Sequence, residues 1–217
     1  MNIIEQDLSF AGEHLILTNQ RILYWPREDT LVLSDLHLGK VAHFRKHGIA
    51  LPRQIAERDI ERLAKLITHY AARQVVITGD LVHAGANTEV KLFALLTSQF
   101  PDTTFILIKG NHDRFVDKKL SAIGLHAIYS SWNIGPIYFT HQYTPDLADK
   151  WTISRHLHPG VRVQLPTKKY LRCPCYAVTE NQVILPAFSL FTGLDTTSIP
   201  KDAKCYAFLE EGFFTVG

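Results

Sequence analysis

The sequence predicts an α/β protein built as a four-layer α/β/β/α sandwich, with two mixed sheets packed together and helices outside. Three observations predict it: short apolar strands alternate with amphipathic helices in the first half, short strands dominate the second half, and polar clusters directly follow several strands. The chain has 217 residues, of which 46% are hydrophobic and 20% are charged. That size and composition suit a single domain over residues 1–217.

The first half of the chain alternates strands with helices. Residues 2–25 are expected to form strands in a hairpin or meander, with strands at 15–17 and 22–24. The elements expected after it are a strand at 31–33, a loop at 39–51, a helix at 52–72, a strand at 75–77, a helix at 88–99 and a strand at 105–108. Pro52 suits the first turn of a helix, and apolar residues then recur at helical spacing as far as Tyr70. This alternation predicts parallel strands joined by helical crossovers.

The second half of the chain, after a short helix near residues 117–123, consists mainly of short strand-like segments. The expected strands lie at residues 137–140, 153–155, 161–165, 175–179, 182–185, 205–209 and 212–216. We expect them to form a second sheet that packs on the first, because a sheet must bury its apolar face.

Several classes of protein are excluded by the composition. The three cysteines, two of them in Cys173-Pro174-Cys175, make neither a disulfide framework nor a four-ligand zinc site. No apolar run reaches membrane-spanning length, and the N-terminal segment carries Glu5 and Asp7 where a signal peptide has basic and apolar regions. We therefore expect a cytoplasmic protein that has reduced thiols and no membrane association.

The distribution of charge says more about partners than the net charge of +2. No acidic residue lies between Asp35 and Glu57, or between Asp149 and Glu180. These two segments contain the basic residues Lys40, Arg45, Lys46 and Arg53, and Lys150, Arg155, Arg162, Lys168, Lys169 and Arg172. By themselves they fit either a solvated face or a surface for an anionic partner.

Polar clusters stand at the ends of the predicted strands. They are Asp35 with His37, then Asp80, Asn111-His112-Asp113, His141, and His156 with His158. Because side chains alternate along an extended segment, Asp35 and His37 are expected to point to the same side. Reactive groups of parallel sheets gather at the carboxyl ends of the strands, so the first three clusters should meet at one edge.

Each cluster alone has an ordinary explanation. Gly79-Asp80 and Gly110-Asn111 suit tight turns, a single histidine such as His141 is often a hydrogen-bonded core residue, and two histidines near one strand can arise by chance. Together the clusters supply oxygen ligands and four imidazoles, which suit two divalent ions sharing one carboxylate. The complete set therefore predicts a metal centre.

This series of motifs resembles that of the calcineurin-like metallophosphoesterases, D-x-H, G-D, G-N-H-[D/E], H and G-H-x-H, over residues 31–158. The resemblance implies the calcineurin-like phosphoesterase fold and two divalent metal ions, manganese before iron, zinc or cobalt. By the family's pattern one ion is held by Asp35, His37, Asp80 and His158, and the other by Asp80, Asn111, His141 and His156, with Asp80 bridging.

The resemblance also implies a chemistry. Two close cations lower the pKa of a bridging water, and the resulting hydroxide attacks phosphorus. His112 would be the general acid or transition-state stabiliser, and Asp113 would orient it. One residue departs from the family's pattern, because Arg155 stands where the last motif has glycine. This affects the local backbone and the room beside the second ion, and Arg155 joins Lys40 and Arg45 as a candidate for binding a substrate phosphate.

A narrower resemblance is to the ligase-associated DNA damage response endonucleases, the PdeM-like phosphoesterases. The matching pieces lie at residues 35–40 with Phe44, Arg45 and Gly48 after them, and at residues 79–83, 156–159, 184–188 and 191–193. This resemblance implies a phosphodiesterase, specifically a nuclease in DNA repair. The two acid-free segments would then border the metal cleft and contact phosphates without sequence preference.

Two other functions stay open. One keeps the chemistry but acts on a nucleotide, a cyclic nucleotide or a lipid-linked diphosphate, of which the lipid is disfavoured because no amphipathic membrane-binding helix is evident. The other is a non-catalytic interaction module on the same fold, which the complete set of ligands and His112 disfavours. The sequence does not determine the oligomeric state.

Overall fold

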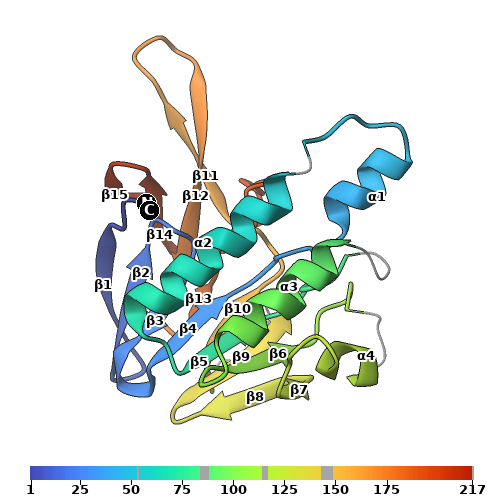
Figure 1. Cartoon of the computed structure of the whole chain (residues 1–217). Coiled ribbons are helices and arrows are strands. Elements are labelled where there is room, and N and C mark those ends of the chain that lie inside the picture. Colours follow the sequence, from blue (N-terminus) through green and yellow to red (C-terminus); the bar gives the residue numbers. More distant parts are fainter. Residues whose placement is uncertain (53, 84–87, 114–116, 143–148, 217) are drawn as a thin grey trace.

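The structure, a computed structural model, describes residues 1–52, 54–83, 88–113, 117–142 and 149–216, so the basic residue Arg53 lies outside the described residues. Two mixed sheets pack face to face, with helices on the outer side of the first (Figure 1). This arrangement confirms the predicted α/β architecture with two sheets.

The first sheet comes from the N-terminal half of the chain. Its strands are β1 (Glu5–Phe10), β2 (Glu13–Thr18), β3 (Leu23–Trp25), β4 (Thr30–Leu33), β5 (Gln74–Ile77), β6 (Thr104–Ile108) and β7 (Ala127–Tyr129), paired in that order. The pairs from β1 to β4 are antiparallel, and those from β4 to β7 are parallel. The predicted parallel strands are therefore confirmed, and their carboxyl ends lie at one edge.

Helices cover the outer face of this sheet. They are α1 (Lys40–Lys46), α2 (Gln54–Tyr70), α3 (Thr88–Gln99) and α4 (Asp117–Ser121), with a short 3-10 turn, η1, at Pro26–Glu28. In Figure 1 α2 and α3 run side by side in front of the central strands. A buried cluster fills this layer, with Leu63, Leu66 and Phe93 from the helices packed on Leu31 and Ile77 from the strands. No helix among the described residues is both long and apolar enough to cross a bilayer.

The second sheet comes mostly from the C-terminal half. Its strands are β8 (Ser131–Ile134), β9 (Ile137–Gln142), β10 (Trp151–Arg155), β11 (Gly160–Gln164), β12 (Tyr170–Val178), β13 (Gln182–Ile184), β14 (Lys204–Leu209) and β15 (Gly212–Val216). β10 runs parallel to both β9 and β13, whereas the other pairs are antiparallel. A second buried cluster joins the two sheets, with Val32 and Val76 facing Phe139, Ile153 and Val183.

The outer face of the second sheet is covered differently. A third cluster lies there, in which the three buried cysteines Cys173, Cys175 and Cys205 pack with Ala203 and Ile199. All four α-helices of the described residues lie between Lys40 and Ser121, so a non-helical segment closes this side. The thiols are free, as the sequence predicted.

Several elements differ from the sequence-based expectation, in which neither β7 nor β8 was predicted as a strand. β12 begins at Tyr170, five residues before the predicted strand, because it pairs with β11 along the whole of a long hairpin.

The predicted loop at residues 39–51 is wrong in its first part, where the helix α1 forms. The cap of α1 comes from another element: the Glu89 carboxylate on α3 accepts hydrogen bonds from the backbone N–H of Gly39 (2.6 Å) and of Ala42 (3.1 Å). An acid at a helix N-terminus stabilises it, and nothing near α1 in the sequence reveals this one.

The cap on α1 can be tested by Glu89→Ala. We expect a loss of about 1–2 kcal/mol in the free energy of unfolding, because two N–H groups at a partly buried helix end lose their acceptor. Amide hydrogen exchange should become faster over residues 40–46 in particular. Glu57→Gln, at an exposed acid in the first turn of α2, is the matched control. Unchanged exchange in α1 of the Glu89 variant would contradict the tertiary cap.

Candidate metal centre

The loops that follow β4 and β5 are bonded to each other directly beyond the strands. The N–H of Asp35 donates to the carbonyl of Gly79 (3.2 Å), and the N–H of His37 donates to the carbonyl of Asp80 (3.0 Å). A bridge between Leu38 and Val82 continues the pairing. The parallel register of β4 and β5 therefore extends into the loops and places Asp35 and Asp80 together.

The backbone of these loops is not extended, which corrects one step of the sequence analysis. Five of the predicted ligands, Asp35, His37, Asp80, His156 and His158, have positive φ angles between 47° and 91°. Together they make up half of the ten non-glycine residues with positive φ among those described. Residues other than glycine rarely adopt this conformation, and when they do they cluster at functional sites, where the surrounding structure compensates for the strain. Asp35 and His37 converge through this left-handed turn rather than through strand alternation.

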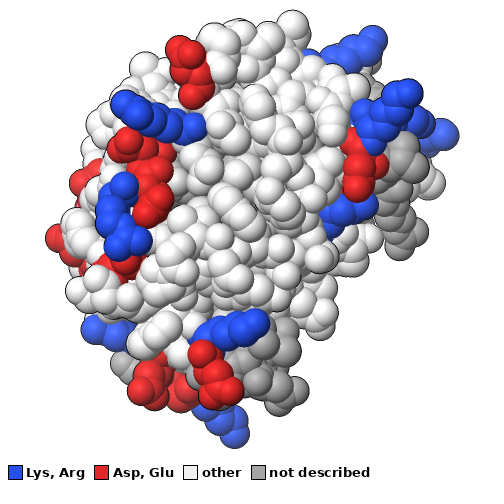
Figure 2. Space-filling model, turned by 90° about the horizontal axis from the view of Figure 1, so that it is seen from below, with Lys and Arg blue, Asp and Glu red and all other residues white. Residues whose placement is uncertain are grey.

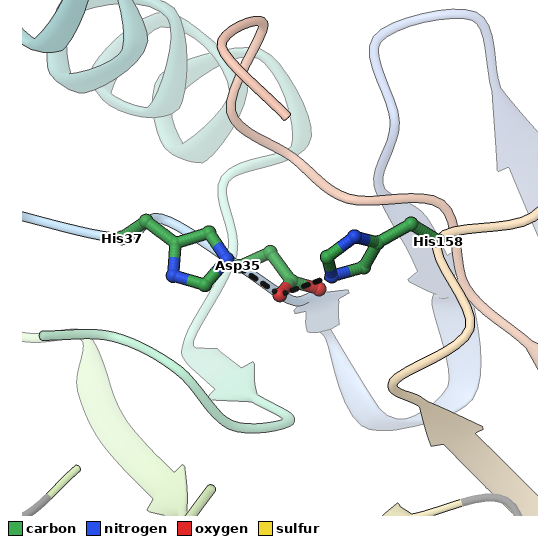
Figure 3. A group of neighbouring side chains, drawn as sticks. All are labelled: Asp35, His37 and His158. Carbon is green, nitrogen blue, oxygen red and sulfur yellow. Dashed lines mark hydrogen bonds and ion pairs between the residues drawn. The ribbon is translucent and has the colours of Figure 1, made fainter. Parts of the chain in front are cut away.

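Asp35 lies between two imidazoles from different parts of the chain (Figure 3). The Nε2 atoms of His158 and His37 lie 3.0 Å and 3.2 Å from its Oδ1 atom. One ligand atom from each of these three residues lies within 4.8 Å of the others, a spacing that suits a metal ion. The carboxylate is fully buried, and its Oδ2 atom and the Nδ1 atom of His37 have no hydrogen-bond partner. Unpartnered buried polar atoms are uncommon and call for an additional ligand.

A second group forms beside the first. The Nε2 atom of His141 lies 2.9 Å from Asn111 Oδ1, and the rings of His141 and His156 have centroids 5.5 Å apart. Asp80 bonds to the neighbouring loop, because its Oδ1 accepts from the N–H of His112 (3.0 Å). The Nδ1 atom of His141 is buried and has no hydrogen-bond partner.

Two glycines make room for this second group. A Cβ atom at Gly79 would overlap the His141 ring, and one at Gly110 would overlap Asp80 Oδ1. Gly79 also has a φ of 92°, which a side chain would strain. The glycines of the G-D and G-N-H-D motifs are therefore required by the packing of the site as well as by the turns.

Arg155 occupies the centre of the site. Its guanidinium is 1% exposed, its Nη2 contacts both Asp35 Oδ1 and Asp80 Oδ2, and its Nη1 lies 3.2 Å from His158 Nε2. A bulge beside it shifts the register so that Arg155 on β10 stands opposite Gln142. In this arrangement Arg155 pairs with carboxylates of the protein, and its predicted contact with a substrate phosphate stays a prediction.

Burial and charge set the protonation of these groups. Burial alone would raise the pKa of Asp35, but hydrogen bonds from His158 and His37 and the charge of Arg155 outweigh it and hold that pKa well below its usual range. Burial lowers the pKa of His141 to about 4, with Arg155 adding to the effect, and it also lowers the pKa of His37 and His156. These imidazoles are therefore neutral near pH 7 and have lone pairs available to a metal.

His112, the predicted general acid, lies next to the first group of ligands. Its ring stacks on that of His83 at 4.9 Å and meets the His37 ring edge-on at 5.7 Å. His83 is a site residue that motif reasoning missed, although it stands three residues after Asp80. Burial lowers the pKa of His83 to about 4, helped by the histidines and Lys40 nearby. It is therefore a neutral stacking partner for His112.

Asp113 has different contacts from those predicted. Its two carboxylate oxygens accept hydrogen bonds from the backbone N–H of Val82 and of Gly110, both at 2.9 Å. It thus joins the loops after β5 and β6, and burial raises its pKa to about 6. These contacts favour a role in positioning the loops over the predicted role of orienting the His112 ring.

The two remaining basic candidates lie apart from each other. Lys40 is half-buried at the start of α1, where burial lowers its pKa while the nearby Asp35 charge opposes this effect. Arg45 is exposed, donates to the carbonyl of Leu51 (2.9 Å) and lines a separate cavity of about 380 Å³ beside Glu57 and Glu89. Lys40 therefore lies near enough to Asp35 and Asp80 for their charges to act on its ammonium, and Arg45 lies at the edge of a separate cavity.

A segment from the C-terminal part of the chain closes the site from behind. The N–H groups of Phe188 and Ser189 donate to the carbonyls of Ser34 (2.8 Å) and Asp35 (3.1 Å). Arg62 lies over the Phe188 ring at 4.1 Å, and Arg21 donates to the carbonyl of Ser189 (3.2 Å). This accounts for the C-terminal motif at residues 184–188, which holds the strand end that carries Asp35.

Comparison with known proteins agrees with this geometry. The family model for calcineurin-like phosphoesterases matches residues 29–170, more than half of the chain. The chain belongs to the calcineurin-like phosphoesterase family. No curated protein matches it.

Among solved structures, a nuclease of Pseudomonas putida is 24% identical in sequence to this chain and has a TM-score of 0.81. The match covers 98% of this chain and 100% of the nuclease. At that identity the likeness shows the fold. A protein of unknown function from Aquifex aeolicus is 16% identical in sequence, with a TM-score of 0.42. The match covers 59% of this chain and 77% of the Aquifex chain.

Family membership confirms the resemblance drawn from the motifs. Calcineurin-like phosphoesterases hold divalent metals with the types of side chain found here, and the unpartnered atoms of Asp35, His37 and His141 fit such ions. The predicted ligands Asp35, His37, Asp80, Asn111, His141, His156 and His158 are brought to one place by the loops described above. Their roles as ligands stay predictions. The fit is incomplete at one point, because the Arg155 guanidinium stands among the ligands of the first ion.

The packing of His141 against glycine can be tested by Gly79→Ala. We expect Mn²⁺ affinity, measured by isothermal titration calorimetry, to fall by about 10–100-fold, because the new methyl group displaces the His141 ring. Gly212→Ala is the matched control, since an added Cβ meets no atom there. Equal affinity in the Gly79 variant would contradict the placement of His141 as a metal ligand.

Proposed function

We propose that this protein is a metal-dependent phosphodiesterase that hydrolyses nucleic acid. The observation that carries the proposal is the convergence of the predicted ligands at one site, from which a basic hairpin extends. Membership of the phosphoesterase family and the likeness in fold to a nuclease support it.

The residues of the site have distinct roles in such a reaction. The bound metal would polarise the phosphoryl group and supply hydroxide near neutral pH. His112, beside the ligands and half-buried, donates a proton to the leaving oxygen. Lys40 offers positive charge to the phosphate from the start of α1, where its ammonium also lies 5.8 Å from the centre of the Phe191 ring. The family pattern predicts two metal ions, with manganese preferred over iron, zinc or cobalt. Arg155 stands among the predicted ligands of the first ion, so its position affects how many ions can bind.

The hairpin of β11 and β12 is the proposed surface for the nucleic acid. It begins at Gly160, close after His158, and projects beyond the rest of the molecule (Figure 1). Four exposed basic residues lie on it, at positions 162, 168, 169 and 172, in a segment without acidic residues. Arg162 and Arg172 stand directly opposite each other across the two strands. Like charges in that position destabilise a hairpin, so they favour a role in binding an anion.

The aromatic side chain on this hairpin supports the same proposal. The Arg162 guanidinium lies 4.5 Å from the centre of the Tyr170 ring, which is 56% exposed. A two-stranded ribbon fits the major groove of a duplex, and aromatic rings stack on exposed bases of single strands. Figure 2 shows the molecule from below, where basic side chains at the edges are interspersed with acidic ones. The acid-free hairpin is distinct from that mixed surface.

The proposal is tested by assaying Mn²⁺-loaded protein on a phosphodiester and a phosphomonoester with the same leaving group, and on single- and double-stranded DNA. We expect the diester and DNA to be hydrolysed in preference. His112→Ala should retain metal but lose about 10²–10⁴-fold in turnover, which shows that hydrolysis belongs to this site. His69→Ala, an exposed histidine on α2, is its control. Preference for the monoester would favour a nucleotide or small-molecule phosphoesterase instead.

The role of the hairpin is tested by replacing its four basic residues with glutamine. Cleavage of DNA should become weaker and less dependent on salt, with the log–log slope reduced by about 0.7–0.9 for each phosphate that the hairpin no longer neutralises. Hydrolysis of a small diester should be unchanged, because the hairpin projects away from the metal ligands.

The matched control replaces four basic residues on the helical side and nearby, at positions 58, 65, 73 and 91, all exposed. Its salt dependence should equal that of the wild type. If both sets of substitutions reduce the slope equally, positive charge in general attracts the DNA and the hairpin has no particular role.

A further inference from the structure

The guanidinium of Arg155 stands where a metal ion is expected. Of the four predicted ligands of the first ion, three contact it: Asp35 and Asp80 through Nη2 and His158 through Nη1. Of the four predicted ligands of the second ion, Arg155 contacts Asp80, the residue that both ions would share. The family pattern has glycine at this position, whose lack of a side chain leaves the space open.

The hydrogen-bond geometry shows that Arg155 and an ion compete for the same atoms. His158 Nε2 lies 3.0 Å from an Asp35 oxygen and 3.2 Å from Arg155 Nη1. One ring nitrogen cannot donate to the carboxylate and also accept from the guanidinium. A divalent ion bound to His158 would need the same nitrogen lone pair that faces Arg155, and it would be repelled by the guanidinium charge at contact distance.

Arg155 is also held firmly in this place. Its side chain is 1% exposed and comes from the end of β10, which is paired on both sides, with β9 and β13. Its charge is balanced by two buried carboxylates, those of Asp35 and Asp80. Moving the guanidinium out before an ion takes its place would leave both carboxylates without a cation, and an uncompensated buried charge is costly.

We propose that the Arg155 guanidinium replaces the first of the two metal ions, so that this protein binds one divalent ion, held by Asp80, Asn111, His141 and His156. The inference rests on the metal site of the proposed function. It replaces a centre of two metal ions with a centre of one metal ion and one guanidinium. Arg155 then neutralises Asp35 and Asp80 as the first ion would, and it presents N–H donors in place of a Lewis acid.

The test counts metal ions. Protein stripped with a chelator is loaded with MnCl₂, desalted and analysed for manganese per chain. We expect one ion in the wild type and two in Arg155→Gly, which restores the family residue, and in Arg155→Gln, which removes the charge but keeps much of the volume. Arg162→Gly, at an exposed arginine of the hairpin, is the matched control and should retain one ion. Electron paramagnetic resonance should show an isolated Mn²⁺ in the wild type and a coupled pair in the Arg155 variants.

Two ions or none in the wild type would overturn the proposal, and so would a count of one in both Arg155 variants. The site of the single ion is tested in the wild-type background, where folding of the Arg155 variants is not at issue. His141→Ala should lose the ion, and His37→Ala should retain it. The reverse pattern would also overturn the proposal. Because counting ions requires no substrate, its result is separate from whether the protein cleaves nucleic acid.

Discussion

Two carboxylates buried side by side are the constraint on which the rest of this structure depends. Asp35 is 0% exposed and Asp80 is 2% exposed, and both lie where β4 and β5 end. Two anions at this depth require cations, because water cannot solvate them and the protein around them is a poor dielectric. Imidazoles, a guanidinium and the proposed metal are gathered around this point for that reason.

The arrangement of the loops follows from the same requirement. Left-handed turns at Asp35, His37 and Asp80 direct their side chains inward, and bonds between the two loops hold the turns. Asp113 joins the loop after β5 to the loop after β6, and the segment at Phe188 supports Asp35 from behind. The strain of the turns is local, whereas the interactions that compensate for it come from four separate parts of the chain.

Arg155 is the residue at which this site departs from the pattern of its family. The ligand types and the glycines around His141 follow the family pattern, and the guanidinium between the carboxylates does not. The basic hairpin begins directly after the loop that carries His156 and His158.

Local patterns in the sequence were enough to predict most of the strands and helices, the parallel strands of the first sheet, and the residue types that meet at their ends. These features are encoded locally, in apolar runs such as residues 31–33 and in the polar residues directly after them. The helix α1 depends on a contact between distant segments, because its cap is Glu89 from α3. The left-handed turns do so as well, since no local pattern at Asp35 or His37 requires them. The tertiary structure also decided the place of Arg155, since the carboxylates that receive it are 75 and 120 residues away in the chain. Contacts between distant segments leave no trace in a local pattern, and they set the charge balance of this site.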